Sequence, residues 1–84
     1  MTKLTAETFA NISGIARIAP WNNRTYINLD CGKGWNGDAR TKVWFRDMTL
    51  TIEMGKGYTS PEFRAALAAV EAAATAAGAK IVTL

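Results

Sequence analysis

Apolar and polar residues alternate with period two on both sides of Asp47-Met48, within the stretch Arg40–Met54. This pattern predicts two strands joined by a two-residue turn. On the apolar face, that turn opposes Phe45 to Leu50, Val43 to Ile52 and Thr41 to Met54. On the other face, it opposes Arg46 to Thr49, Trp44 to Thr51 and Lys42 to Glu53. A slip of one residue would exchange the two faces and bury charge, so this register is strongly specified.

A second hairpin is predicted earlier in the chain, where Ile12–Pro20 and Arg24–Cys31 also alternate. Asn22-Asn23 is the expected turn, because asparagine tolerates a positive φ. Closing the hairpin there opposes Ile18 to Ile27, Ala16 to Leu29 and Gly14 to Cys31. The segment GKGWNGDA, residues 32–39, is expected to be a loop because its glycines do not favour a strand.

One substantial helix is predicted after these strands. Ser60-Pro61-Glu62 offers an N-cap serine, a proline at the first helical position and an acid in the first turn. Phe63, Leu67, Val70 and Ala74 follow at helical spacing, and Gly78 is a natural C-terminal cap. Lys80–Leu84 then reads as a short terminal strand. Thr2–Asn11 is expected to be a short helix that is no more than an appendage.

The predicted fold is a single α+β domain spanning residues 1–84. Consecutive strands with short connections usually pair with their neighbours. We therefore expect a four-stranded antiparallel meander, with one C-terminal helix packed on one face and a short terminal strand. A domain this small buries about 60–65% of its unfolded surface. Self-association as a homodimer is therefore expected, because the edges of the first and fourth strands, together with the terminal segment Lys80–Leu84, need covering.

Composition narrows the function. The chain has 84 residues, with ten basic and seven acidic residues and a net charge of +3, which permits nucleic-acid binding without requiring it. Histidine is absent, which removes the usual general base and the commonest metal ligand, so we predict no enzyme activity, metal or cofactor. Cys31 is the single cysteine and fits a reducing compartment. With neither a signal peptide nor a membrane span evident, a cytoplasmic protein is expected.

Cations and aromatic rings are interleaved on the predicted polar face and in two similar loops. Gly32-Lys33-Gly34-Trp35 follows the second strand, and Gly55-Lys56-Gly57-Tyr58 follows the fourth. Strands of a meander that run in the same direction end at the same rim, so these loops are expected to lie together. Single-stranded nucleic-acid binders use such combinations of charge and stacking. The candidate binding residues are Arg17, Arg24, Tyr26, Lys33, Trp35, Arg40, Lys42, Trp44, Arg46, Lys56 and Tyr58.

Two other interpretations account for the same residues. Outward aromatic rings also serve cross-strand packing, and Gly-Lys-Gly is common in turns. Alternatively, exposed rings and arginines form the hot spots of protein interfaces. The chain would then be a small protein-interaction module, such as a phage or mobile-element inhibitor that docks on a host protein.

The segments RTYINLD, TKVWFRD and GKGYTSPEFRAAL, within residues 24–72, give four strands and then a helix with basic and aromatic residues on the sheet. In this arrangement the chain resembles the modules of the PC4-like, PUR and whirly single-strand-binding proteins. The resemblance implies that the sheet presents rings and cations to single-stranded nucleic acid, with DNA favoured, and that two copies pair. It lies in architecture and residue character, so it transfers no individual binding residue.

Overall fold

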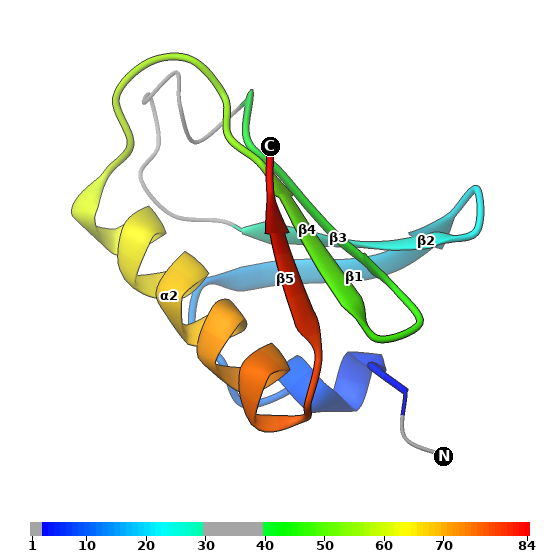
Figure 1. The fold of residues 1–84 in the computed structure, drawn as a ribbon. Helices are drawn as coiled ribbons and strands as arrows, with labels where there is room; N and C mark the ends of the chain where they lie inside the picture. The colour runs from blue at the N-terminus through cyan, green and yellow to red at the C-terminus, as the bar shows by residue number, and fades with distance from the viewer. Residues whose placement is uncertain (1–2, 30–39) are drawn as a thin grey trace.

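The computed structural model describes residues 3–29 and 40–84, which form a sheet with one long helix against it (Figure 1). In chain order the elements are the 3₁₀ helix η1 (Ala6–Phe9), β1 (Ile15–Trp21), β2 (Arg24–Leu29), β3 (Lys42–Arg46), β4 (Thr49–Glu53), α2 (Pro61–Ala76) and β5 (Lys80–Thr83). The sheet order is β1-β2-β3-β4-β5. The first four strands pair antiparallel, and β5 pairs parallel to β4. The α+β prediction is confirmed. The terminal strand joins the sheet as its fifth strand, so the fourth strand is not the sheet edge that was expected.

The β3–β4 hairpin has the predicted register. Its five opposed pairs run from Lys42–Glu53 to Arg46–Thr49. Asp47 in the turn has a φ of 52°, in the left-handed region that tight hairpin turns require. Val43 and Phe45 are buried, as are Leu50 and Ile52 opposite them. Met54, predicted on this buried face, lies beyond the end of β4 and is 41% exposed.

The β1–β2 hairpin follows the prediction near its turn and departs from it farther away. Asn22 and Asn23 have φ values of 50° and 64°, and Ile18 opposes Ile27. The register then shifts between Ile15 and Arg17, so that Ile15, rather than Ala16, opposes Leu29. The predicted Ala16–Leu29 pair is therefore wrong. This irregularity lets the larger Ile15 pack against the core while Ala16 is exposed. Cys31 and the pair predicted for it lie outside the described residues.

Helix α2 covers one face of the sheet and begins and ends as predicted. Ser60 is the N-cap, and its Oγ accepts a 3.0 Å hydrogen bond from the Phe63 N–H. After the helix, Gly78 has a φ of 89°, and the Ala79 N–H donates back to the Ala74 carbonyl over 2.9 Å. The helical side chains buried against the sheet are Phe63, Ala66, Leu67, Val70 and Ala74. No helix among the described residues is long and apolar enough to cross a membrane.

The N-terminal segment is part of the core, which corrects its prediction as an appendage. Leu4 is buried and Phe9 is 1% exposed. The Phe9 ring lies 5.4 Å from the ring of Phe45, centroid to centroid. The Leu4 N–H also donates to the Asp47 carbonyl over 3.2 Å, which ties this segment to the β3–β4 turn. The helix-side core therefore has contributions from both ends of the sequence.

Candidate functional site

The sheet face opposite α2 is defined by the strand register, because directly opposed residues share a face. Ala19 opposes Tyr26, Tyr26 opposes Trp44, Trp44 opposes Thr51, and Thr51 opposes Val82. These residues form a row across all five strands. We call the face that carries this row the outward face.

Three aromatic rings are in contact on the outward face. The centroids of Trp21 and Tyr26 are 6.2 Å apart, with planes at 61°. Those of Tyr26 and Trp44 are 6.5 Å apart, with planes at 46°. Such tilted pairs lie within the range of favourable ring contacts, and none is parallel enough to hold a base between its rings. The rings therefore form one aromatic surface on which a ligand would stack from outside.

Arg24 contacts two of the three rings of this aromatic surface. Its guanidinium carbon lies 4.0 Å from the centroid of the Trp44 ring, a cation–π contact. Its Nη1 also donates to the Tyr26 hydroxyl over 3.4 Å. One face of Trp44 is thus covered by a guanidinium plane. A base at this position would stack on Arg24 or displace it, whereas the sequence prediction had Trp44 itself as the stacking platform.

Cations stand at both ends of the aromatic surface. At one end, Arg17 opposes Asn28, and Lys42 begins β3 opposite Glu53. At the other end, the register carries Arg24 to a position beside Arg46, and Lys80 opposes Thr49 on β4. Like charges on neighbouring strands destabilise a sheet unless something neutralises them. Extended by one residue, the register places Arg24 opposite Arg46, where an anionic group would reduce the repulsion between the two arginines.

Part of the outward face is hollowed into a shallow groove of about 400 Å³. Its lining residues are Arg17, Ala19, Pro20, Trp21, Tyr26, Asn28 and Lys42. The groove combines both cations of one end with two of the three rings. Predicted site residues from three separate strands thus come together in one place.

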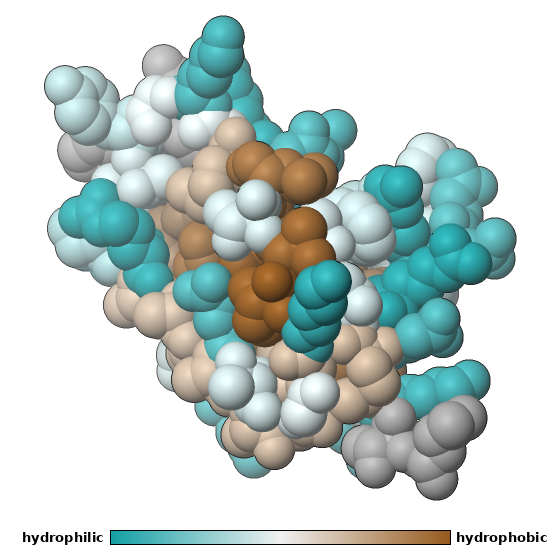
Figure 2. Space-filling view, in the orientation of Figure 1, coloured by the Kyte–Doolittle hydropathy of each residue, from teal (hydrophilic) through white to brown (hydrophobic). Residues whose placement is uncertain are grey.

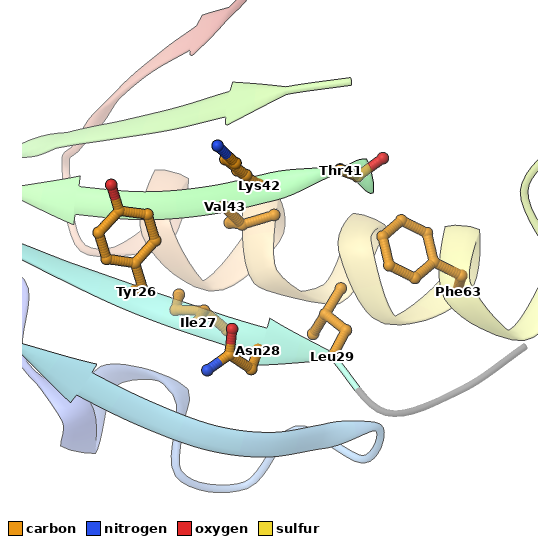
Figure 3. A pocket seen from close by; sticks show the side chains of 8 residues that line it. All are labelled: Tyr26, Ile27, Asn28, Leu29, Thr41, Lys42, Val43 and Phe63. Atoms are coloured by element: carbon orange, nitrogen blue, oxygen red, sulfur yellow. The ribbon is translucent and has the colours of Figure 1, made fainter. Parts of the chain in front are cut away.

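A smaller opening lies where β2 and β3 separate beyond Tyr26 and Trp44 (Figure 3). It has a volume of about 230 Å³ and is lined by Tyr26, Ile27, Asn28, Leu29, Thr41, Lys42, Val43 and Phe63. Figure 3 shows Tyr26 on β2 and Lys42 on β3, while Phe63 comes from α2. Lys42 is the one charged residue among these eight, and we assign no ligand to this opening.

The predicted rim residues Arg40, Lys56 and Tyr58 are exposed, and Tyr58 is 82% exposed. Arg40 precedes Thr41, and Lys56 and Tyr58 follow Gly55. These two segments are hydrogen-bonded to each other, because the Gly55 N–H donates to Thr41 Oγ1 over 3.0 Å. These residues are absent from the linings of both cavities, so the structure does not join them to the groove. Lys33 and Trp35, the other half of the predicted rim, lie outside the described residues.

Gly55 should not tolerate a side chain. A Cβ built there would lie 2.4 Å from Arg40 Cβ and 2.6 Å from the Arg40 carbonyl carbon. We expect Gly55→Ala to lower the free energy of unfolding by about 1–3 kcal/mol, the usual range for overpacking. Urea unfolding followed by circular dichroism would measure it, with Lys56→Ala as the neighbouring control. Equal midpoints for Gly55→Ala and wild type would contradict this close packing.

Trp21 is a site residue that the sequence prediction omitted. It is 65% exposed, and it ends β1 directly before the Asn22-Asn23 turn. The available signal was the turn itself, because closing the hairpin at these asparagines opposes Trp21 to Arg24. That pairing puts Trp21 on the same face as the predicted Arg24 and Tyr26.

Comparison of the chain with models of known protein families, with curated proteins and with solved structures finds no significant match. Among the described residues, no group of three or more His, Cys, Asp or Glu side chains lies close enough to hold a metal ion.

Proposed function

We propose that the protein binds single-stranded nucleic acid on its outward face, without catalysis. The observation that carries this proposal is the continuous surface of Trp21, Tyr26 and Trp44, with cations at both of its ends. Rings supply stacking that tolerates any base, and the flanking cations supply attraction to the phosphates.

The shape of the surface favours an unpaired strand over a duplex. The bases of a duplex are stacked on one another, so their faces are not available to protein rings. An unpaired strand can lay its bases on the rings while its phosphates lie toward Arg17 and Lys42 at one end and Arg46 at the other. The net charge of +3 is modest, and the stacking rings would therefore supply a large share of the affinity.

A protein partner is the second candidate, and the exposure of Trp21 favours it. Trp, Tyr and Arg are the residue types enriched at interface hot spots, and Trp21, Tyr26 and Arg24 are neighbours here. The two candidates differ in salt dependence. Phosphate binding releases condensed counterions and weakens steeply with salt, whereas docking through rings weakens much less.

Replacing Trp21 tests how much an aromatic ring contributes to binding, separately from the contribution of charge. We expect Trp21→Ala to weaken binding to a fluorescently labelled single-stranded oligonucleotide by about 1–3 kcal/mol, the usual contribution of one stacked base. The slope of log affinity against log salt should not change, because a ring releases no counterions.

Two matched variants sharpen this assay. Trp21→Phe should retain most of the affinity, while Tyr58→Ala, at an exposed ring off the aromatic surface, should bind like wild type. If Trp21→Ala binds with wild-type affinity, the aromatic surface is not a stacking platform. If the wild-type protein shows no affinity for oligonucleotides at low salt, the protein-docking function replaces this one.

A further inference from the structure

In the part of the chain that the structure describes, β5 is an edge strand of the sheet. Among the described residues, no strand follows β5 in the sheet order. The N–H groups of Lys80 and Leu84 donate to the Met48 and Ile52 carbonyls of the neighbouring chain segment, each over 2.8 Å. Backbone groups alternate in direction along a strand. The backbone N–H and C=O groups of Ile81 and Thr83 therefore point toward the free edge.

The opposite edge of the sheet, at β1, is protected in ways that β5 is not. The β1 register is broken by the shift between Ile15 and Arg17. Pro20 opposes Thr25, one step from the turn-flanking Trp21–Arg24 pair, so its nitrogen faces away from β2 and offers no donor to a new strand. Prolines and bulges of this kind prevent edge pairing. The β5 strand, Lys80–Thr83, contains neither a proline nor a bulge.

The β5 edge is also hydrophobic. Figure 2 shows apolar side chains gathered along β5 toward its C-terminal end, with hydrophilic side chains on either side. Ile81 and Val82 are half-buried, and Leu84 is 69% exposed. An accessible strand edge with an apolar strip is the kind of surface on which another strand pairs.

We infer that β5 pairs antiparallel with β5 of a second copy of this chain. With a two-fold axis at Val82, the Val82 residues of the two copies lie opposite each other. Ile81 then lies opposite Thr83 of the second copy. Every outward-pointing backbone group of Ile81 and Thr83 then has a partner, in hydrogen-bonded pairs on either side of the axis. The contact is isologous, so it closes at a dimer and does not propagate into a fibre.

The side chains at this edge are complementary between the two copies in this register. Opposed residues share a face, so Lys80 lies across from Leu84 of the second copy and covers its exposed side chain. Leu84 continues β5 beside the last residue of β4, Glu53, because Ile52 opposes Thr83. Lys80 of one copy therefore extends toward Glu53 of the other, and the two-fold axis repeats this opposite-charge approach. Both apolar surface and charge are complementary between two identical copies.

Pairing in this register joins two five-stranded sheets into one continuous sheet. A two-fold axis perpendicular to the sheet keeps both outward faces on the same side. The row of Tyr26, Trp44, Thr51 and Val82 then continues through Val82 of the second copy into an identical row. The dimer does not depend on the proposed function, but it would double the length of surface available to a single strand.

A disulfide trap tests the register directly. In a Cys31→Ser background, Val82→Cys should form a cross-linked dimer on mild oxidation, because opposed residues at a non-hydrogen-bonded pair have Cβ atoms about 4.5–5.5 Å apart. Thr83→Cys is the matched control and should stay monomeric on denaturing gels, since its own equivalent is displaced along the strand. Cross-linking of Thr83→Cys but not of Val82→Cys would overturn this register.

A second variant tests the interface without cross-linking. Thr83→Pro removes an N–H that points to the free edge while leaving the β4–β5 hydrogen bonds in place. Sedimentation should show both wild type and Thr83→Ala as dimers at high micromolar concentration. We expect the Thr83→Pro dimer to dissociate about 30-fold more readily, the factor for two lost hydrogen bonds. A wild type that stays monomeric, or binds only foreign peptide strands at this edge, would refute the inference. Neither experiment contains nucleic acid, so its outcome is independent of the proposed function.

Discussion

Replacing Phe9 by alanine should remove most of the stability of the domain. Phe9 is 1% exposed and packs its ring 5.4 Å from that of Phe45. Removing a buried phenylalanine ring costs about 3–5 kcal/mol, and a domain of this size has a total stability of about 5–10 kcal/mol. The midpoint of thermal unfolding, followed by circular dichroism, should therefore fall by more than 10 °C.

Two variants control for this result. Phe9→Leu keeps most of the apolar volume and should lose less than about 1.5 kcal/mol. Glu7→Ala changes an exposed residue in the same 3₁₀ helix and should melt close to wild type. If Phe9→Ala also melts within a few degrees of wild type, the N-terminal segment does not contribute to the core.

Removing two cations together from the groove should have the largest effect on nucleic-acid binding. Arg17 and Lys42 line the same groove, from β1 and β3. For the Arg17→Ala, Lys42→Ala double variant, we expect an affinity loss of about 10- to 30-fold at low salt. The slope of log affinity against log salt should become shallower by about 1.4, or about 0.7 for each phosphate contact to a single strand.

The control for this variant has the same net charge in a different place. Arg64→Glu lowers the charge by two, as the double variant does, but Arg64 is an exposed residue of α2 whose Nη1 donates to Thr59. If binding follows overall charge, both variants should weaken it equally. A large loss in the double variant with a small loss in Arg64→Glu would locate the binding on the outward face.

Strong local patterns made the β3–β4 hairpin predictable. Its alternation is uninterrupted, and a one-residue slip would bury Lys42 and Arg46, so one register is strongly favoured. The α2 boundaries were predictable for a similar reason, because Ser60 and Gly78 are specific capping residues. In both places, several signals in the sequence agree.

Other parts of the fold depend on contacts that are distant in sequence. The shift near Ala16 depends on how Ile15 packs against the core, which alternation alone does not reveal. Phe9 was undervalued because a four-residue helix carries little periodic signal. The terminal strand was predicted, but its parallel place beside β4 was not, since alternation is the same for parallel and antiparallel pairing.

The residue types of the candidate site were predictable from the sequence, but the prediction of how their side chains are arranged was incomplete. The hairpin registers placed Tyr26 and Trp44 on one face, and the structure brings their rings together. The position of Arg24 over Trp44 depends on side-chain conformations that the register does not specify. Trp21 was omitted because the predicted strand ended at Pro20, one residue too early.

The most direct test of the outward-face proposal is a nuclear magnetic resonance titration of ¹⁵N-labelled protein with a short single-stranded oligonucleotide at low salt. The indole N–H signals of Trp21 and Trp44 report on the aromatic surface itself, and the backbone amides report on every element. We expect the largest shifts at these indoles and along the central residues of β1, β2 and β3, with little change in the amides of α2. Shifts confined to α2, or no shifts at all, would contradict the proposal.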